Sequence, residues 1–280
     1  MKKRSNQLMQ CALLILLWNS NLFPQNARDS IVNIGKYKLH IRESGIGDPA
    51  VIFENGMGED LSTWKEVQPS IAKLTHTLSY DRAGLGKSDP APLGQERDAE
   101  SLAEELHLLL KATQIKGPYI LVGHSLGGAI AQIFAYKYPK EVCGLVLVDP
   151  GDGRLDRMLQ KKLPESIWAA RQKELAEEMS KIPVSVRMEF DGLEKSGEEA
   201  SNAFPLPRIP VFLLTGTKKN PDFPGNPIEQ DLKLQLHKEL AAHVLGIQHI
   251  LVPESRHYIQ NDAPGKVLSA IEQVLAIIQK

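Results

Sequence analysis

The chain alternates between short strand-like segments and longer segments with apolar residues at helical spacing. Segments rich in β-branched, aromatic or aliphatic residues lie at 51–53, 75–80, 119–122, 142–148, 210–215 and 249–252. Helical spacing is found over 63–74, 98–113 and 266–279. Two further strands, at 31–34 and 38–42, predict an opening hairpin. This alternation predicts an α/β fold whose mostly parallel central sheet is flanked by helices.

The regular alternation is interrupted after Asp149. Residues 151–207 carry many charges and have helical spacing in places. A connection this long in a compact fold is typical of a lid or an inserted subdomain. It also follows the sixth predicted strand, at the sheet edge where ligands bind in open α/β sheets. We therefore expect residues 28–150 and 208–280 to form the core and 151–207 to form a helical lid.

Composition and charge are those of an ordinary globular protein. Of the 280 residues, 42% are hydrophobic and 24% are charged, which suits one large domain. The net charge of −1 gives no reason to expect a nucleic acid or an anionic membrane as a partner. The sequence has neither a metal-ligand spacing nor a dinucleotide fingerprint, so no metal and no cofactor are expected.

The first residues have the pattern of a secretory signal peptide. A basic start at 2–4 precedes an apolar stretch at 8–18 that is too short to span a bilayer comfortably. We interpret residues 1–27 as a signal peptide, with an uncleaved N-terminal membrane anchor as the alternative. A secreted or periplasmic protein without a stable membrane span is then expected.

A motif at Ser125 joins a strand to a helix. The strand at 119–122 runs into Gly-His-Ser-Leu-Gly, and helical spacing follows from Ala129. G-x-S-x-G in this context is typical of a nucleophile elbow, in which a strained turn presents the serine at a helix N-terminus. Ser125 is therefore the predicted nucleophile, whereas His124 is expected to pack or to form a hydrogen bond beside it.

A serine nucleophile needs a base, and the base needs an acid to orient it. His257 is the expected base, because it lies between the last strand and the closing helix. Asp149 and Asp222 are the candidate acids. Asp149 is preferred because it is the one charge at the end of an apolar strand, whereas Asp222 lies in a Pro-rich loop. The other late histidines are expected to lie on the surface or to pack.

Acyl transfer also needs hydrogen-bond donors for the oxyanion. One predicted donor is the backbone N–H of Leu126, directly after the elbow serine. The other is the backbone N–H of Met57, in the glycine-rich turn that follows the early strand at 51–53.

These residues together resemble the α/β-hydrolase fold superfamily over residues 31–280. The motifs that match in order are Asn-Gly-Met-Gly at 55–58, Asp-Arg-Ala-Gly-Leu-Gly-Lys-Ser at 81–88, the elbow at 123–128 and His-Tyr-Ile at 257–259. The first motif has Asn where the family usually has His. The resemblance implies the fold and a working triad, but says little about the substrate, because this fold hosts many reactions.

The sequence departs from the family pattern at Lys219. Many members carry the acid at that position, a few residues after a strand like the one at 210–215. The departure favours Asp149, an arrangement that some lipases of the superfamily use. Haloalkane dehalogenases and epoxide hydrolases have an aspartate nucleophile, so Ser125 argues against both.

The sequence thus predicts a serine hydrolase that cleaves a small or medium carboxylic ester through an acyl-enzyme. The charged segment 151–207 argues against the wide apolar surface of a lipase.

Two alternatives stay open. A peptidase of the proline-iminopeptidase kind would need carboxylates to hold a substrate amine, and Glu174, Glu177 and Glu178 are available, although a solvated helix face explains them more simply. A non-catalytic small-molecule binding protein on the same fold is the other.

Overall fold

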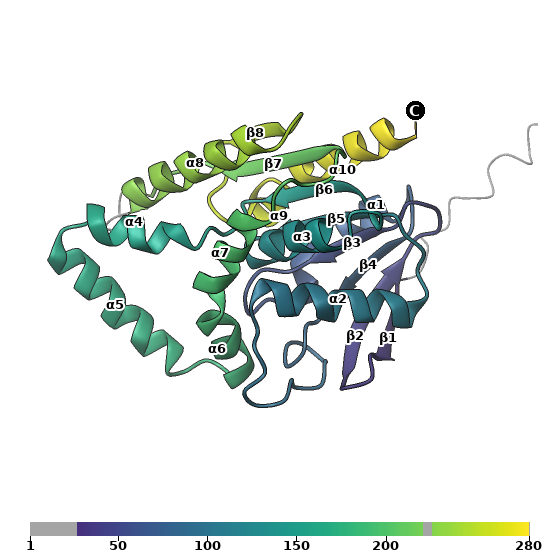
Figure 1. Ribbon diagram of the computed structural model, residues 1–280, viewed down its shortest axis with the longest axis horizontal. Coiled ribbons are helices and arrows are strands. Elements are labelled where there is room, and N and C mark those ends of the chain that lie inside the picture. The colour runs from purple at the N-terminus through teal and green to yellow at the C-terminus, as the bar shows by residue number, and fades with distance from the viewer. Residues whose placement is uncertain (1–26, 221–225, 280) are drawn as a thin grey trace, which may run out of the picture.

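The computed structural model describes residues 27–220 and 226–279, which form an eight-stranded sheet with helices on both faces (Figure 1). The strands are β1 (Arg28–Asn33), β2 (Lys38–Ser44), β3 (Val51–Glu54), β4 (Thr77–Tyr80), β5 (Tyr119–His124), β6 (Val142–Val148), β7 (Val211–Gly216) and β8 (Gln248–Val252). Their order in the sheet is β1-β2-β4-β3-β5-β6-β7-β8. β2 pairs antiparallel with β1 and β4, and all other pairs are parallel. The predicted fold class is confirmed.

The helices fall into groups by the surface that they cover. One face of the sheet carries α2 (Ala99–Thr113) and α3 (Leu126–Lys137), and the other carries α1 (Gln68–Ile71), α9 (Ile259–Asp262) and α10 (Pro264–Ile278). The inserted helices, between β6 and β7, are α4 (Arg154–Lys162), α5 (Glu165–Met179), α6 (Val184–Asp191) and α7 (Leu193–Asn202). The remaining elements are a 3-10 turn, η1 (Leu61–Trp64), and α8 (Asn226–His243), which packs on α4 and β7.

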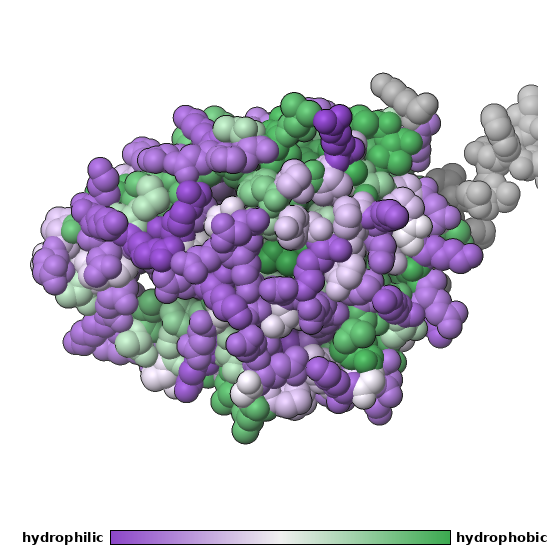
Figure 2. Space-filling model, in the orientation of Figure 1, coloured by the Kyte–Doolittle hydropathy of each residue, from purple (hydrophilic) through white to green (hydrophobic). Residues whose placement is uncertain are grey.

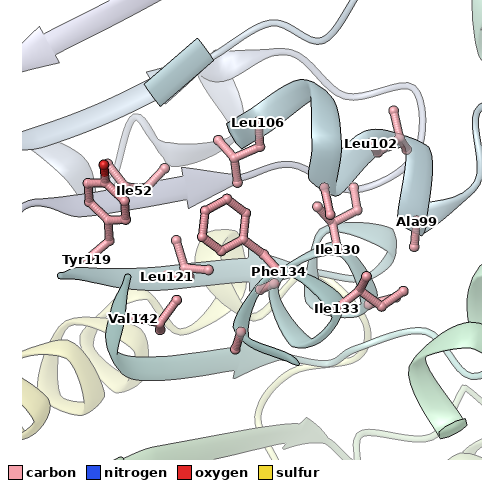
Figure 3. Packing of buried hydrophobic residues seen from close by; sticks show 14 of the residues in the cluster. Ile52, Ala99, Leu102, Leu106, Tyr119, Leu121, Ile130, Ile133, Phe134 and Val142 are labelled. Atoms are coloured by element: carbon pink, nitrogen blue, oxygen red, sulfur yellow. The ribbon is translucent and has the colours of Figure 1, made fainter. Parts of the chain in front are cut away.

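Both faces of the sheet are apolar because both are covered. Along β5, Leu121 faces α2 and α3, whereas Ile120 and Val122 face the layer that contains α1 and α10. Figure 3 shows Phe134 of α3 pointing between Leu121 and Leu106 of α2. Full burial of each such side chain contributes about 2 kcal/mol. The packed sheet therefore gives a firm base to the residues that follow its strands.

Two predictions of secondary structure need correction. The helix predicted over 63–74 is wrong, because η1 and the short α1 are separate and Pro69 stands in the first turn of α1, where proline is favoured. The sequence pattern also did not predict α6. The buried residue of α6 is Glu189 rather than an apolar one, so this helix leaves no apolar stripe in the sequence.

Some sequence predictions fall outside the described residues. These include Asp222 and the predicted signal peptide 1–27, except for Ala27. Within 27–220 and 226–279, no helix combines the length and the apolar character needed to cross a membrane. Figure 2 shows hydrophilic side chains over most of one face of the molecule, including the region of α5.

Candidate active site

Ser125 lies at the sharp turn between β5 and α3. Its backbone has φ 51° and ψ −118°, a conformation that costs a non-glycine residue energy. Ser125 N donates to Val148 O (3.2 Å), and Gly128 N donates to Ser125 O (2.9 Å). A Cβ at Gly127 would lie 2.4 Å from Glu54 O. The end of β3 and the turn that follows it therefore pack against the elbow so closely that a side chain at Gly127 would not fit between them.

His257 and Asp149 come from different strand ends and meet, and His257 lines the same cleft as Ser125. His257 Nδ1 lies 2.8 Å from Asp149 Oδ2. The side chain of His257 is 41% exposed, while that of Asp149 is fully buried. Asp149 has φ 46°, and the described non-glycine residues with positive φ are Gln114, Ser125 and Asp149. Strained backbone of this kind tends to cluster at functional sites.

Asp149 is held as a carboxylate by three donors. Oδ1 accepts from Gly216 N at 2.8 Å, and Oδ2 accepts from Lys233 Nζ at 2.7 Å as well as facing His257. Burial alone would raise the pKa of Asp149, but the hydrogen bond from His257 and the charge of Lys233 outweigh burial and lower the pKa to about 2. Asp149 is therefore ionised at neutral pH.

Lys233 was not found by the sequence analysis. It lies on α8, its side chain is 9% exposed, and it stands 84 residues from its partner Asp149. On the same helix, His237 is fully buried between Thr215 Oγ1 (2.7 Å) and Pro150 O (2.9 Å). Burial lowers the pKa of His237 to about 4, so this histidine packs as a neutral side chain.

Met57 presents its N–H from the turn that follows β3. Gly56 N donates to Glu59 Oε2 at 2.8 Å, and Gly58 N donates to Glu189 Oε2 at 2.9 Å. Between them, the N–H of Met57 donates to no protein atom of the described residues. The turn thus leaves one donor free at the position that the sequence analysis selected.

The N–H of Leu126 has the same character. The carbonyl of Ser125 accepts from Gly128 N (2.9 Å) and from Gly151 N (3.1 Å), and the N–H of a trans peptide points away from its carbonyl. Within the described part of the chain, Leu126 N donates to no protein acceptor. Since β3 and β5 are neighbours in the sheet, the turns that carry Met57 and Leu126 adjoin.

The loop that carries His257 is fastened to its surroundings. His124 Nε2 lies 3.0 Å from His257 O, and His124 Nδ1 lies 3.2 Å from Glu59 Oε2. The expectation that His124 forms hydrogen bonds beside the elbow agrees with these contacts. A Cβ at Gly216 would lie 1.5 Å from Arg256 O, so a residue without a side chain is required where β7 meets this loop.

The position where many family members carry the acid holds a surface ion pair. Lys219 Nζ lies 2.8 Å from Asp231 Oδ2. The described residues contain no group of three His, Cys, Asp or Glu side chains that could hold a metal ion. Lys219 therefore does not take the place of the acid, and the carboxylate that faces His257 is that of Asp149.

A cleft of about 820 Å³ opens above Ser125 and His257. Its walls come from the inserted helices, from α8 and from the loops that follow β6 and β8. Polar side chains in these walls include Gln160, Gln172, Asn226, Glu229 and Gln230. Glu174, Glu177 and Glu178 are exposed on α5 and are absent from the described lining of the cleft.

Comparison with known proteins adds sequence relatives. A family model described as alpha/beta hydrolase fold matches residues 49–180. The chain is 28% identical over 230 residues to the uncharacterized protein YqjL of Bacillus subtilis, which covers 82% of this chain and 85% of that protein. Several other curated relatives match 41–44% of this chain, and the match spans only 19–38% of their own length.

Solved structures resemble the whole chain at low sequence identity. A protein from Acinetobacter baumannii, provisionally named a lipase, matches with a TM-score of 0.70 at 17% identity over 99% of this chain and 98% of that chain. A thermophilic esterase from Thermogutta terrifontis matches with a TM-score of 0.65 at 19% identity over 91% and 100%. A likeness at this level of identity establishes the fold.

Proposed function

We propose that this chain, whose residues 49–180 match the alpha/beta hydrolase fold family, is a serine hydrolase that cleaves a small or medium carboxylic ester. The observation that carries the proposal is the strained elbow at Ser125, which shares a cleft with a histidine whose Nδ1 faces a buried carboxylate at 2.8 Å. Serine, histidine and aspartate in this relation can act as nucleophile, base and acid.

In the proposed reaction, Ser125 Oγ attacks the ester carbonyl while His257 Nε2 takes the hydroxyl proton. Asp149 accepts the hydrogen bond from Nδ1, fixes the tautomer and stabilises the imidazolium. The C–O bond to the alcohol then breaks, and His257 returns the proton to the leaving oxygen. A water molecule, activated by the same imidazole, hydrolyses the acyl-enzyme and releases the carboxylic acid.

The N–H groups of Met57 and Leu126 are the proposed oxyanion donors. Both lack a protein acceptor among the described residues, and they belong to adjoining turns. Donors that are fixed before the reaction stabilise the developing negative charge without reorganising, and the loss of one typically costs about 10²–10³ in kcat.

The size of the cleft supports a small or medium substrate. A volume of about 820 Å³ lies within the usual range for small-molecule sites. We propose that the inserted helices, within residues 151–207, act as the lid that selects the ester. Glu174, Glu177 and Glu178 are exposed on α5 and absent from the described lining of the cleft, so these three residues give no support to an iminopeptidase subsite.

The test uses the wild-type protein and the Ser125→Ala variant. We expect the wild type to hydrolyse p-nitrophenyl esters of short or medium acyl chains and to be labelled by a fluorophosphonate probe. The Ser125→Ala variant should fold normally and do neither. A folded wild type that neither turns over esters nor reacts with the probe would leave the binding-protein alternative in place.

We also propose that the protein acts outside the cytoplasm. The support is the sequence pattern of residues 1–27, a basic start followed by a short apolar stretch. N-terminal sequencing of protein recovered from the periplasm or medium of an expressing bacterium should give a start near residue 28. Retention of the full N-terminus in the membrane fraction would instead support the anchor.

A further inference from the structure

Helix α6 lies directly on the turn that carries Met57. Ser185 Oγ donates to Gly84 O at 2.7 Å, and a Cβ at Gly58 would lie 2.8 Å from Val186 Cγ1. One turn further along the helix, Glu189 Oε2 accepts from Gly58 N at 2.9 Å. α6 belongs to the same insertion as α4, α5 and α7, which line the cleft, so this insertion also contacts the turn of the proposed oxyanion hole.

Arg82 joins Glu189 to the same turn. Its Nε and Nη2 donate to the two carboxylate oxygens of Glu189 at 2.7 and 2.8 Å, and its Nη1 donates to Glu54 Oε1 at 2.8 Å. The remaining two bonds run from Nη1 to Asn55 O (2.7 Å) and from Nη2 to Gly56 O (2.6 Å). A guanidinium has five N–H donors, and all five are used.

These contacts determine the direction of one peptide group. The carbonyl of Gly56 and the N–H of Met57 belong to the same planar peptide, so fixing the oxygen fixes the N–H on the other side. The hydrogen bond from Arg82 to Gly56 O is charge-assisted, which makes it short and strong. It also polarises the peptide, which makes its N–H a better donor.

We propose that Glu189 is a positioning residue, which through Arg82 and Gly58 holds the Met57 N–H in the direction that an oxyanion requires. The inference rests on the proposed function. Arg82, Glu54 and Glu189 are all at most 1% exposed, so water does not replace a lost partner easily. Docking of α6 and assembly of the oxyanion hole are therefore one event, and the site is competent only when this inserted helix is in place.

The decisive variant is Glu189→Gln, which keeps the size of the side chain. A carboxamide has only one acceptor oxygen, so its NH₂ group must face a donor of Arg82 and the two-point pairing is lost. We expect kcat for a p-nitrophenyl ester to fall roughly tenfold to a hundredfold while KM stays within about twofold, because the loss concerns the transition state. The matched control is Glu178→Gln, an exposed position on α5, which should leave both constants unchanged.

A transition-state analogue separates positioning from a general structural effect. An alkyl boronic acid forms a tetrahedral anion on the serine, so its inhibition constant should rise in Glu189→Gln by the same factor as kcat/KM falls. Thermal unfolding of the variant and its circular dichroism show whether the fold is retained. Should Glu189→Gln prove unstable, Arg82→Lys, which keeps the charge but loses the planar fork, is expected to give the same proportional losses.

Two outcomes would overturn the inference. One is a Glu189→Gln variant with wild-type kcat and boronate affinity. The other is a loss of kcat with unchanged boronate affinity, which would place the effect outside the oxyanion hole. A wild type without any turnover would instead defeat the proposed function, so the two failures are distinguishable.

Discussion

Two buried groups of charges flank the strand that leads to Ser125, and they are built differently. One follows β3 and β4 and centres on Arg82; the other follows β6 to β8 and centres on Asp149. Each donor of Arg82 has its own fixed acceptor. In contrast, one oxygen of Asp149 is shared between Lys233 and the part-exposed His257. The first arrangement suits Arg82, which holds a turn in a fixed position. The second suits Asp149, whose neighbour His257 is proposed to gain and lose a proton.

The largest expected effect is at the shared carboxylate. Asp149→Asn should lower kcat for an ester by about 10⁴, because the amide no longer holds the imidazole in the required tautomer. Steady-state kinetics on the purified variant provide the measurement. Asp222→Asn is the comparison and should cost little. A large loss in Asp222→Asn with a small one in Asp149→Asn would transfer the role of the acid.

The Arg82 group should contribute most to stability. Arg82→Met leaves the buried carboxylate of Glu54 without its cation and leaves Glu189 with the more distant Arg97, at 3.8 Å. We therefore expect the free energy of unfolding to fall by about 3–5 kcal/mol. Lys233→Met should cost clearly less, because Asp149 keeps its bonds to Gly216 and His257. Urea denaturation followed by circular dichroism compares the two. Equal losses would contradict the distinction between the groups.

Acid should lower the free energy of unfolding through His237, which lies on the Asp149 side of the sheet. Burial lowers the pKa of His237 from 6.5 to about 4, so between these pH values the unfolded chain binds a proton that the folded protein does not. The contribution of His237 to the free energy of unfolding is therefore complete above pH 6.5. It declines by about 3 kcal/mol in all as the pH falls toward 4. The free energy of unfolding, measured by urea denaturation at several pH values in this range, should depend less on pH in His237→Gln than in the wild type. The same pH dependence of the free energy of unfolding in both proteins would show that another group causes the loss of stability.

The smallest expected effect is at Lys233. Its Nζ lies 2.7 Å from Asp149 Oδ2, but Gly216 N and His257 Nδ1 hold the same carboxylate. In Lys233→Met, we therefore expect kcat for an ester to change only a few fold, with KM unchanged, in steady-state kinetics. Lys219→Met, which removes a lysine from a surface ion pair, is the control. An unchanged kcat with a raised KM would instead make Lys233 a substrate contact.

The sequence was most informative where function depends on a local pattern. The elbow at Ser125 could be predicted because strand, turn and helix follow one another within a few residues, and the alternation of elements was enough to predict the sheet. Glu189 and Lys233 could not be predicted in this way. Their partners lie 107 and 84 residues away, and a charged residue on the buried side of a helix looks like an interruption of the pattern.

The buried carboxylate of α6 has a consequence for how this protein can be modified. Exchange of residues 151–207 for the corresponding segment of a relative is an obvious way to alter specificity in a fold with an insertion at this point. Such a graft would leave Arg82 with unpaired donors under the catalytic turn unless it brought a carboxylate to the place of Glu189. The insertion is therefore not a free module, and a chimera has either to keep a carboxylate at the place of Glu189 or to replace Arg82 as well.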